Sequence, residues 1–190
     1  HECVCEVLAQ PSKDRELEII QADDRINHME EEINDLAIES LALLAPVASD
    51  LRKVIGTIKI ATELERIGDY AKNIAKFMIK HDHLSDVIAD YSISMEKDLI
   101  RMLEQALQCM VDQDEEAAFA IPERDNMINQ QMQDIRAKLL SKENLEKEDI
   151  LKELFEISAM LRNIERAGDH VKNICEHVLY MMKGQHYDFG

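Results

Sequence analysis

The chain carries one ten-residue signature twice, and this internal repeat constrains its fold more than any other feature. At an offset of 100 positions, residues 65–74 share seven identities with residues 165–174, in the pattern Glu-Arg-x-Gly-Asp-x-x-Lys-Asn-Ile. A second match, offset by 102 positions, consists of these pairs: Asp23 with Asp125, Ile26 with Ile128, and Asn27 with Asn129. Two unrelated helices that share only a hydrophobic period are not expected to have seven identical residues in ten positions. The chain is therefore predicted to be a duplicated module.

Composition and patterning indicate an all-α fold. Only five of the 190 residues are glycine and three are proline, tryptophan is absent, and residues that favour helices dominate. Apolar residues recur with helical spacing over these predicted helices: about 13–44, 46–80, 87–111, 115–140 and 147–182. The connectors are predicted at 81–86 and as a polar turn at 141–144.

Prolines and glycines mark the expected helix ends. Pro46 suits the first turn of the second long helix, and Pro122 is expected to kink its helix or displace its start. Gly184 is expected to end the last helix, leaving a loose tail to Gly190.

Long helices joined by short loops pack as antiparallel bundles. We predict two tandem three-helix bundles, spanning residues 1–83 and 84–190. The opening helix of the first bundle is represented only by residues 1–10, so we expect it to be truncated.

Charge and cysteine content limit the classes of partner and location. A net charge of −17 argues against nucleic-acid binding and against unaided docking on an anionic membrane. The chain has neither an apolar run of roughly 20 residues nor the pattern of a signal peptide. The four cysteines lack zinc-finger or redox-centre spacing and suit a reducing compartment, with Cys175 on an apolar helix face. We therefore expect a cytoplasmic protein with no membrane insertion.

The signature places two carboxylates on one helix face, because residues four apart lie one above the other. One interpretation is an ion-pair ladder with the neighbouring arginines and with Lys72 and Lys172. Two observations favour a metal site instead. A glycine inside each helix lowers helix stability by about 1 kcal/mol relative to alanine. Its presence is explained if a backbone or a ligand must approach the helix closely at that point. A facing helix can also supply further oxygens. The candidate metal ligands are Glu65, Asp69, Asp23 and Asn27 in the first copy, and Glu165, Asp169, Asp125 and Asn129 in the second.

Oxygen-rich ligand sets suit hard cations. Magnesium, manganese and iron fit best, and zinc with its nitrogen or sulfur ligands fits less well. No histidine has a glutamate three residues before it, so the redox chemistry of ferritin-type bundles is disfavoured.

Residues 64–75, Leu-Glu-Arg-Ile-Gly-Asp-Tyr-Ala-Lys-Asn-Ile-Ala, resemble the signature of the PhoU family, accessory regulators of phosphate-specific transport. Residues 163–170 resemble its second copy, and residues 46–52 are similar to another family segment.

The resemblance implies two three-helix bundles related by pseudo-twofold symmetry, assembled as a homodimer. It also implies metal ions, including iron clusters, bound through Glu/Asp-x-x-x-Asp motifs. The implied function is negative regulation of the phosphate regulon, in which the state of the phosphate ABC transporter is relayed to a sensor histidine kinase. The expected partners are therefore the transporter ATPase and that kinase. Asn27 and Asn129 stand where a second carboxylate is common in the family, which favours fewer or more weakly held ions.

No catalytic motif is present, so we expect a non-enzymatic regulator of phosphate transport and signalling. Three alternatives stay open: a carboxylate-bridged metalloenzyme, a regulatory domain for a different phosphate transporter, and a plain helical scaffold.

Overall fold

The computed structural model describes residues 1–81, 83–139 and 148–190 and contains helices but no strand within them. The all-α prediction is confirmed. The helices are α1 (Glu2–Ala9), α2 (Lys13–Leu44), α3 (Ser49–Lys80), α4 (Asp86–Asp112), α5 (Glu115–Ala120), the 3-10 turn η1 (Pro122–Arg124), α6 (Asp125–Leu139) and α8 (Glu148–Lys183). The predicted polar turn at 141–144 lies outside the described residues.

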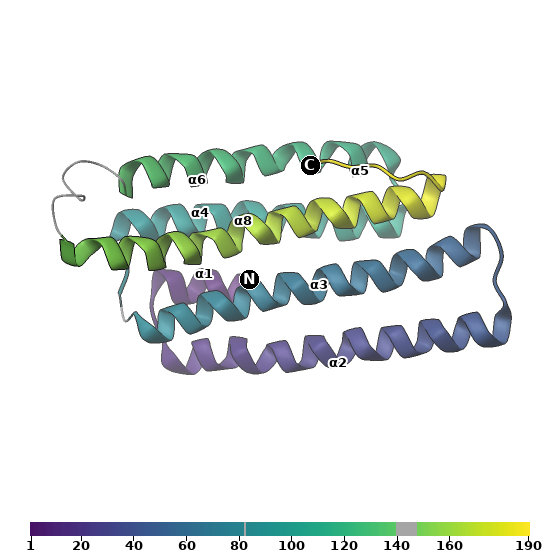
Figure 1. Cartoon of the computed structure of the whole chain (residues 1–190), viewed down its shortest axis with the longest axis horizontal. Helices are drawn as coiled ribbons and strands as arrows, with labels where there is room; N and C mark the ends of the chain where they lie inside the picture. Colours follow the sequence, from purple (N-terminus) through teal and green to yellow (C-terminus); the bar gives the residue numbers. More distant parts are fainter. Residues whose placement is uncertain (82, 140–147) are drawn as a thin grey trace.

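The long helices lie side by side in an elongated bundle (Figure 1). α2 packs against α3, α3 packs against α8, and α8 packs against α4 and α6. The short α1 lies against α2, α3 and α4. At eight residues, α1 is much shorter than the 27-residue α4.

The connection between α2 and α3 differs from the prediction. α2 ends where Ala45 takes the left-handed conformation, at φ 44°, and Ala48 also has a positive φ of 50°. Pro46 therefore lies in the loop rather than in the first turn of α3, which begins only at Ser49. Ala48, at φ 50° and ψ −112°, lies outside the right-handed helical region, so α3 cannot begin before Ser49.

The two helix ends predicted at Pro122 and Gly184 are confirmed. α5 ends at Ala120 and α6 begins at Asp125, with Pro122 opening the 3-10 turn between them. Gly184, at φ 69°, follows the last residue of α8.

The tail after Gly184 is not loose. The Phe189 N–H donates to Glu176 Oε1 at 2.8 Å. The rings of Tyr187 and Phe189 lie edge-on to Phe119, with centroids 5.0 and 6.1 Å away. Burial of two aromatic rings offsets the entropy lost in ordering so short a segment.

One hydrophobic core runs through both copies of the repeat. Its fully buried side chains include Ile74 and Met78 of α3, Leu99 of α4, and Ile164 and Ile174 of α8. α3 packs between α2 and α8, and α8 packs between α3 and the pair α4 and α6, so α3 and α8 form the central layer of the molecule. The division at residues 83 and 84 stays a prediction.

No helix in the described part of the chain combines the length and apolar character that a membrane crossing requires.

Candidate functional site

The first acidic site, formed by Asp23, Asn27, Glu65 and Asp69, lies between α2 and α3. Asp23 of α2 is only 3% exposed, although it is an acid. Lys72 Nζ donates to Asp23 Oδ2 at 2.6 Å and to Asp69 Oδ1 at 2.5 Å. The lysine therefore bridges the buried carboxylate of α2 and the signature aspartate of α3.

The second acidic site, formed by Asp125, Asn129, Glu165 and Asp169, repeats this arrangement between α6 and α8. Asp125 is 2% exposed. Lys172 Nζ lies 3.2 Å from Asp125 Oδ2 and 3.0 Å from Asp169 Oδ1. Lys172 also donates to the Gly190 carbonyl oxygen at 2.5 Å. Two aspartates and one lysine therefore meet in the same way in both copies.

Both lysines are held in the charged form. Hydrogen bonds to Asp23 and then to Asp69 raise the pKa of Lys72. Burial acts to lower the pKa of Lys172, but the hydrogen bonds and charges of Asp169 and Asp125 outweigh it, so this pKa is also raised. Burial raises the pKa of Asp125, and the charge of Lys172 opposes part of that effect.

The two glutamates of the sites pair with arginines rather than with the bridging lysines. Arg66 Nε lies 3.5 Å from Glu65 Oε2, and Arg136 Nη2 of α6 lies 3.3 Å from Glu165 Oε2. Burial and then the neighbouring charge of Asp69 raise the pKa of Glu65. The structure thus joins Asp23 to Asp69 and Asp125 to Asp169 through lysine, with each glutamate at the edge of its site.

The two asparagines also point donors at their aspartates. Asn129 Nδ2 donates to Asp125 Oδ2 at 2.7 Å, and Asn27 Nδ2 donates to Asp23 Oδ2 at 3.4 Å. Each buried aspartate therefore receives its helix neighbour's amide as well as the ammonium.

The glycine of the signature makes room for the facing helix. A Cβ at Gly168 would lie 2.6 Å from Asp125 Oδ1, and a Cβ at Gly68 would lie 2.9 Å from Ile26 Cδ1. The close approach is made by side chains of α6 and α2, and neither a backbone nor a ligand is needed to explain it. Gly168 thus permits Asp125 to reach α8, whereas Gly68 makes room for Ile26 against α3.

The two copies meet at equivalent positions. Tyr70 and His170 are 100 residues apart and so hold the same place in the repeat. The Tyr70 hydroxyl lies 3.4 Å from His170 Nε2, and the ring centroids are 5.5 Å apart. Contact between equivalent residues of α3 and α8 is consistent with a pseudo-twofold relation between the two copies.

A sequence model of the PhoU domain matches residues 2–78 and 93–178, which is most of the chain. The chain belongs to the PhoU family. It is 31% identical over 182 residues to the phosphate-specific transport system accessory protein PhoU of Serratia marcescens, covering 94% of this chain and 74% of that protein. The PhoU homolog of Clostridium acetobutylicum is 30% identical over 195 residues, covering all of this chain and 87% of that one.

Two crystal structures of PhoU proteins have the same fold. PhoU from Pseudomonas aeruginosa superposes with a TM-score of 0.86 at 28% identity, covering 97% of this chain and 88% of that one. The phosphate transport system regulatory protein PhoU from Streptococcus pneumoniae gives 0.84 at 25% identity, covering 98% and 88%.

The PhoU resemblance implies metal ions at the two acidic sites, and the positions of the site residues show whether an ion would fit. In each acidic site a lysine ammonium lies between the two aspartates, where a cation would have to bind. Among the residues that the structure describes, no group of three or more histidine, cysteine, aspartate or glutamate side chains is placed to hold a metal ion. Because an ammonium occupies the position between the aspartates, this arrangement does not fit a resident metal ion there, although Oδ1 of Asp23 and of Asp125 is buried without a hydrogen-bond partner. Metal binding stays a prediction from the resemblance.

A third polar cluster, centred on Glu63, was not predicted from the sequence of this PhoU-family chain. Glu63 Oε2 accepts from His170 Nδ1 at 2.5 Å and from Asn173 Nδ2 at 3.1 Å. Glu63 Oε1 lies 3.5 Å from His177 Nε2. Burial acts to raise the pKa of Glu63, but the hydrogen bonds from the two histidines and Asn173 outweigh it and lower this pKa to about 2.

The α8 half of this cluster was visible in the sequence, since His170, Asn173 and His177 are spaced along one helix face. Their partner was not, because Glu63 lies just outside the repeated signature. The cluster joins α3 to α8, and so ties one copy of the repeat to the other.

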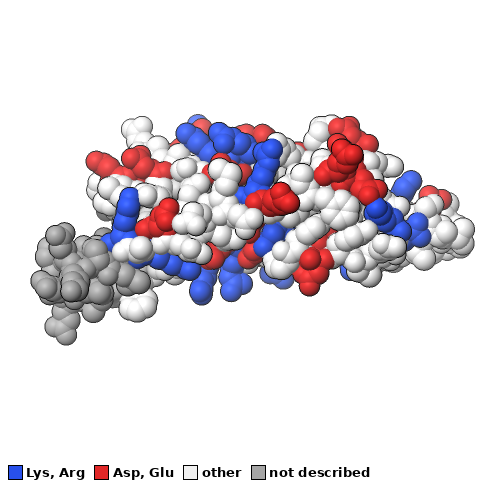
Figure 2. All heavy atoms as spheres, turned by 90° about the horizontal axis from the view of Figure 1, so that it is seen from above, with Lys and Arg blue, Asp and Glu red and all other residues white. Residues whose placement is uncertain are grey.

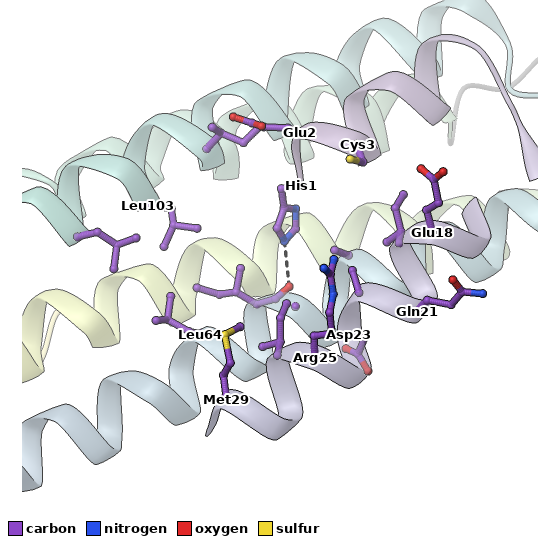
Figure 3. Close-up of a pocket in the computed structure, with 18 of the residues that line it drawn as sticks. His1, Glu2, Cys3, Glu18, Gln21, Asp23, Arg25, Met29, Leu64 and Leu103 are labelled. Carbon is purple, nitrogen blue, oxygen red and sulfur yellow. Dashed lines mark hydrogen bonds between the residues drawn. The ribbon is translucent and has the colours of Figure 1, made fainter. Parts of the chain in front are cut away.

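A mainly apolar cavity of about 980 Å³ lies among α1, α2, α3 and α4 (Figure 3). His1 points into it, with Nε2 2.9 Å from the Ile67 carbonyl oxygen and Nδ1 2.7 Å from Glu96 Oε2. Asp23 and Gly68 also line this cavity, so it adjoins the first acidic site.

Proposed function

We propose that this chain is an accessory regulator of phosphate-specific transport. The supporting observation is that relatives named as PhoU accessory proteins of that system align over most of this chain and of their own length. In the finer form of the proposal, the chain is a negative regulator of the phosphate regulon. It relays the state of the phosphate ABC transporter, through its ATPase, to a sensor histidine kinase.

The surface supports protein partners. Acidic and basic side chains are interleaved over the face seen in Figure 2, with no continuous basic area. The net charge of −17 opposes binding to nucleic acid, whose phosphates would be repelled. Charge complementarity therefore favours proteins with basic surfaces.

The proposal includes a cytoplasmic location, a homodimer and no catalytic role. The continuous core and the Glu63 cluster both join α3 to α8, and so hold the two copies of the repeat together.

Complementation tests the proposal. In bacteria deleted for their own PhoU, a phosphate-regulon reporter is active at high phosphate. Expression of this chain is expected to restore repression, and an affinity-tagged form is expected to retain the transporter ATPase on purification. A folded chain expressed at normal level that neither represses the reporter nor retains the ATPase would contradict the proposal. Light scattering of the purified chain tests the homodimer separately.

A further inference from the structure

Each acidic site contains an internal cation at its centre. Lys72 Nζ is within 2.6 Å of oxygens from α2 and α3, and Lys172 Nζ is within 3.2 Å of oxygens from α6 and α8. An ammonium has three donors and no acceptor, so it can bridge two carboxylates as a small cation does. The arrangement recurs in two copies of different surrounding sequence, so it does not depend on one chance contact.

The buried aspartates need such a cation. Asp23 and Asp125 are 3% and 2% exposed, and a buried carboxylate is costly unless it is paired and hydrogen-bonded. Lys72 and Lys172 have side chains only 19% and 10% exposed, which limits competition from water. The chain thus supplies each buried aspartate with a cationic partner.

Most of the remaining polar groups of the sites are already paired, although Oδ1 of Asp23 and of Asp125 is buried without a hydrogen-bond partner. Hard cations such as Mg²⁺ take about six oxygen ligands. Here Arg66 pairs with Glu65, Arg136 pairs with Glu165, and the amides of Asn27 and Asn129 donate to the aspartates. A metal ion in either site would also lie next to an ammonium and be repelled by it.

We infer that Lys72 and Lys172 take the place of metal ions in this chain, fastening α2 to α3 and α6 to α8 without a resident metal. The consequence is a protein whose stability does not depend on divalent cations. Removal of the lysines should expose a set of unpaired carboxylates, and with it a demand for a divalent cation. This inference is independent of the regulatory proposal.

The test compares the full native chain with the double variant Lys72→Met, Lys172→Met. For the native chain, we expect negligible metal by elemental analysis and a Tm that neither EDTA nor millimolar Mn²⁺ moves. For the variant, we expect Tm to fall by roughly 5 °C or more in EDTA and to recover in Mn²⁺, because an ion that binds only the folded state stabilises it. Lys59→Met, Lys76→Met is the matched control, because it removes two exposed lysines of α3.

Three results would overturn the inference. The first is a native chain that retains about one metal ion or more per site and loses it on Asp69→Asn, Asp169→Asn substitution. The second is a native Tm that falls in EDTA and returns with Mn²⁺. The third is a double variant with the Tm of the control in both conditions. Where the double variant does not fold, the metal content and EDTA response of the native chain decide.

Discussion

Glu63 of α3 accepts a hydrogen bond from His170 of α8, with Oε2 and Nδ1 2.5 Å apart. The two residues are 107 positions apart and belong to different copies of the repeat. Because α3 and α8 form the central layer, this contact lies where the two halves of the molecule are joined.

Replacement of Glu63 should weaken that joint. Glu63→Gln keeps the shape but removes the charge that His170, Asn173 and His177 stabilise, so we expect the free energy of unfolding to fall by about 1–3 kcal/mol. Urea unfolding followed by circular dichroism measures it. Glu39→Gln, on an exposed part of α2, is the matched control and should leave the midpoint unchanged. Equal midpoints for the two variants would show that the cluster contributes no stability.

The Glu63 carboxylate should also make the free energy of unfolding decrease at acidic pH. The pKa of Glu63 is lowered from an ordinary value of 4.5 to about 2, so its contribution is complete above pH 4.5. It is lost as the pH falls from there to about 2, since the unfolded chain binds the proton first. The native chain should lose more stability across this window than Glu63→Gln. Parallel curves for the two proteins, measured by urea unfolding at each pH, would contradict this prediction.

The two signature glycines should respond differently to alanine. At Gly168 the new Cβ would lie 2.6 Å from Asp125 Oδ1, and this oxygen belongs to a buried carboxylate held by Lys172. We expect Gly168→Ala to lower the free energy of unfolding by about 1–3 kcal/mol. At Gly68 the nearest atom is the flexible end of Ile26, so the gain of about 1 kcal/mol in helix propensity should offset the cost. Thermal unfolding of the two variants provides the comparison, and a more damaging Gly68→Ala would reverse the assignment.

The four free cysteines should differ in reactivity. Cys3 is exposed, whereas Cys109 and Cys175 are buried, and burial raises the pKa of Cys175 to about 12. Since the thiolate is the reactive form, a disulfide reagent at pH 8 should modify Cys3 rapidly and the two buried thiols only after denaturation. Mass spectrometry after brief labelling identifies the modified residues. Rapid labelling of Cys175 in the native chain would mean that the α8 core opens readily.

Much of the fold was predictable because the relevant signals are local. The helical period and the breaks at Pro122 and Gly184 act over a few residues, and α2, α4 and α8 begin or end within a residue or two of the predicted positions. The start of α3 was missed because it depends on the positive φ of Ala48, which an alanine in the sequence does not predict. The order of the tail was missed because it depends on Phe119, far away in the chain.

The candidate sites divide in the same way. The sequence alone determined that the chain is a duplicated all-α module and that Glu65 shares a helix face with Asp69, because both follow from the repeat and the helical period. Only the tertiary structure decided that Lys72 lies between Asp69 and Asp23, and that Glu63 meets His170. The physical reason is that a long side chain can pair on its own helix or across to another. Helix packing determines which pairing is available, because it brings Lys72 to Asp23, 49 positions away, and Glu63 to His170, 107 positions away.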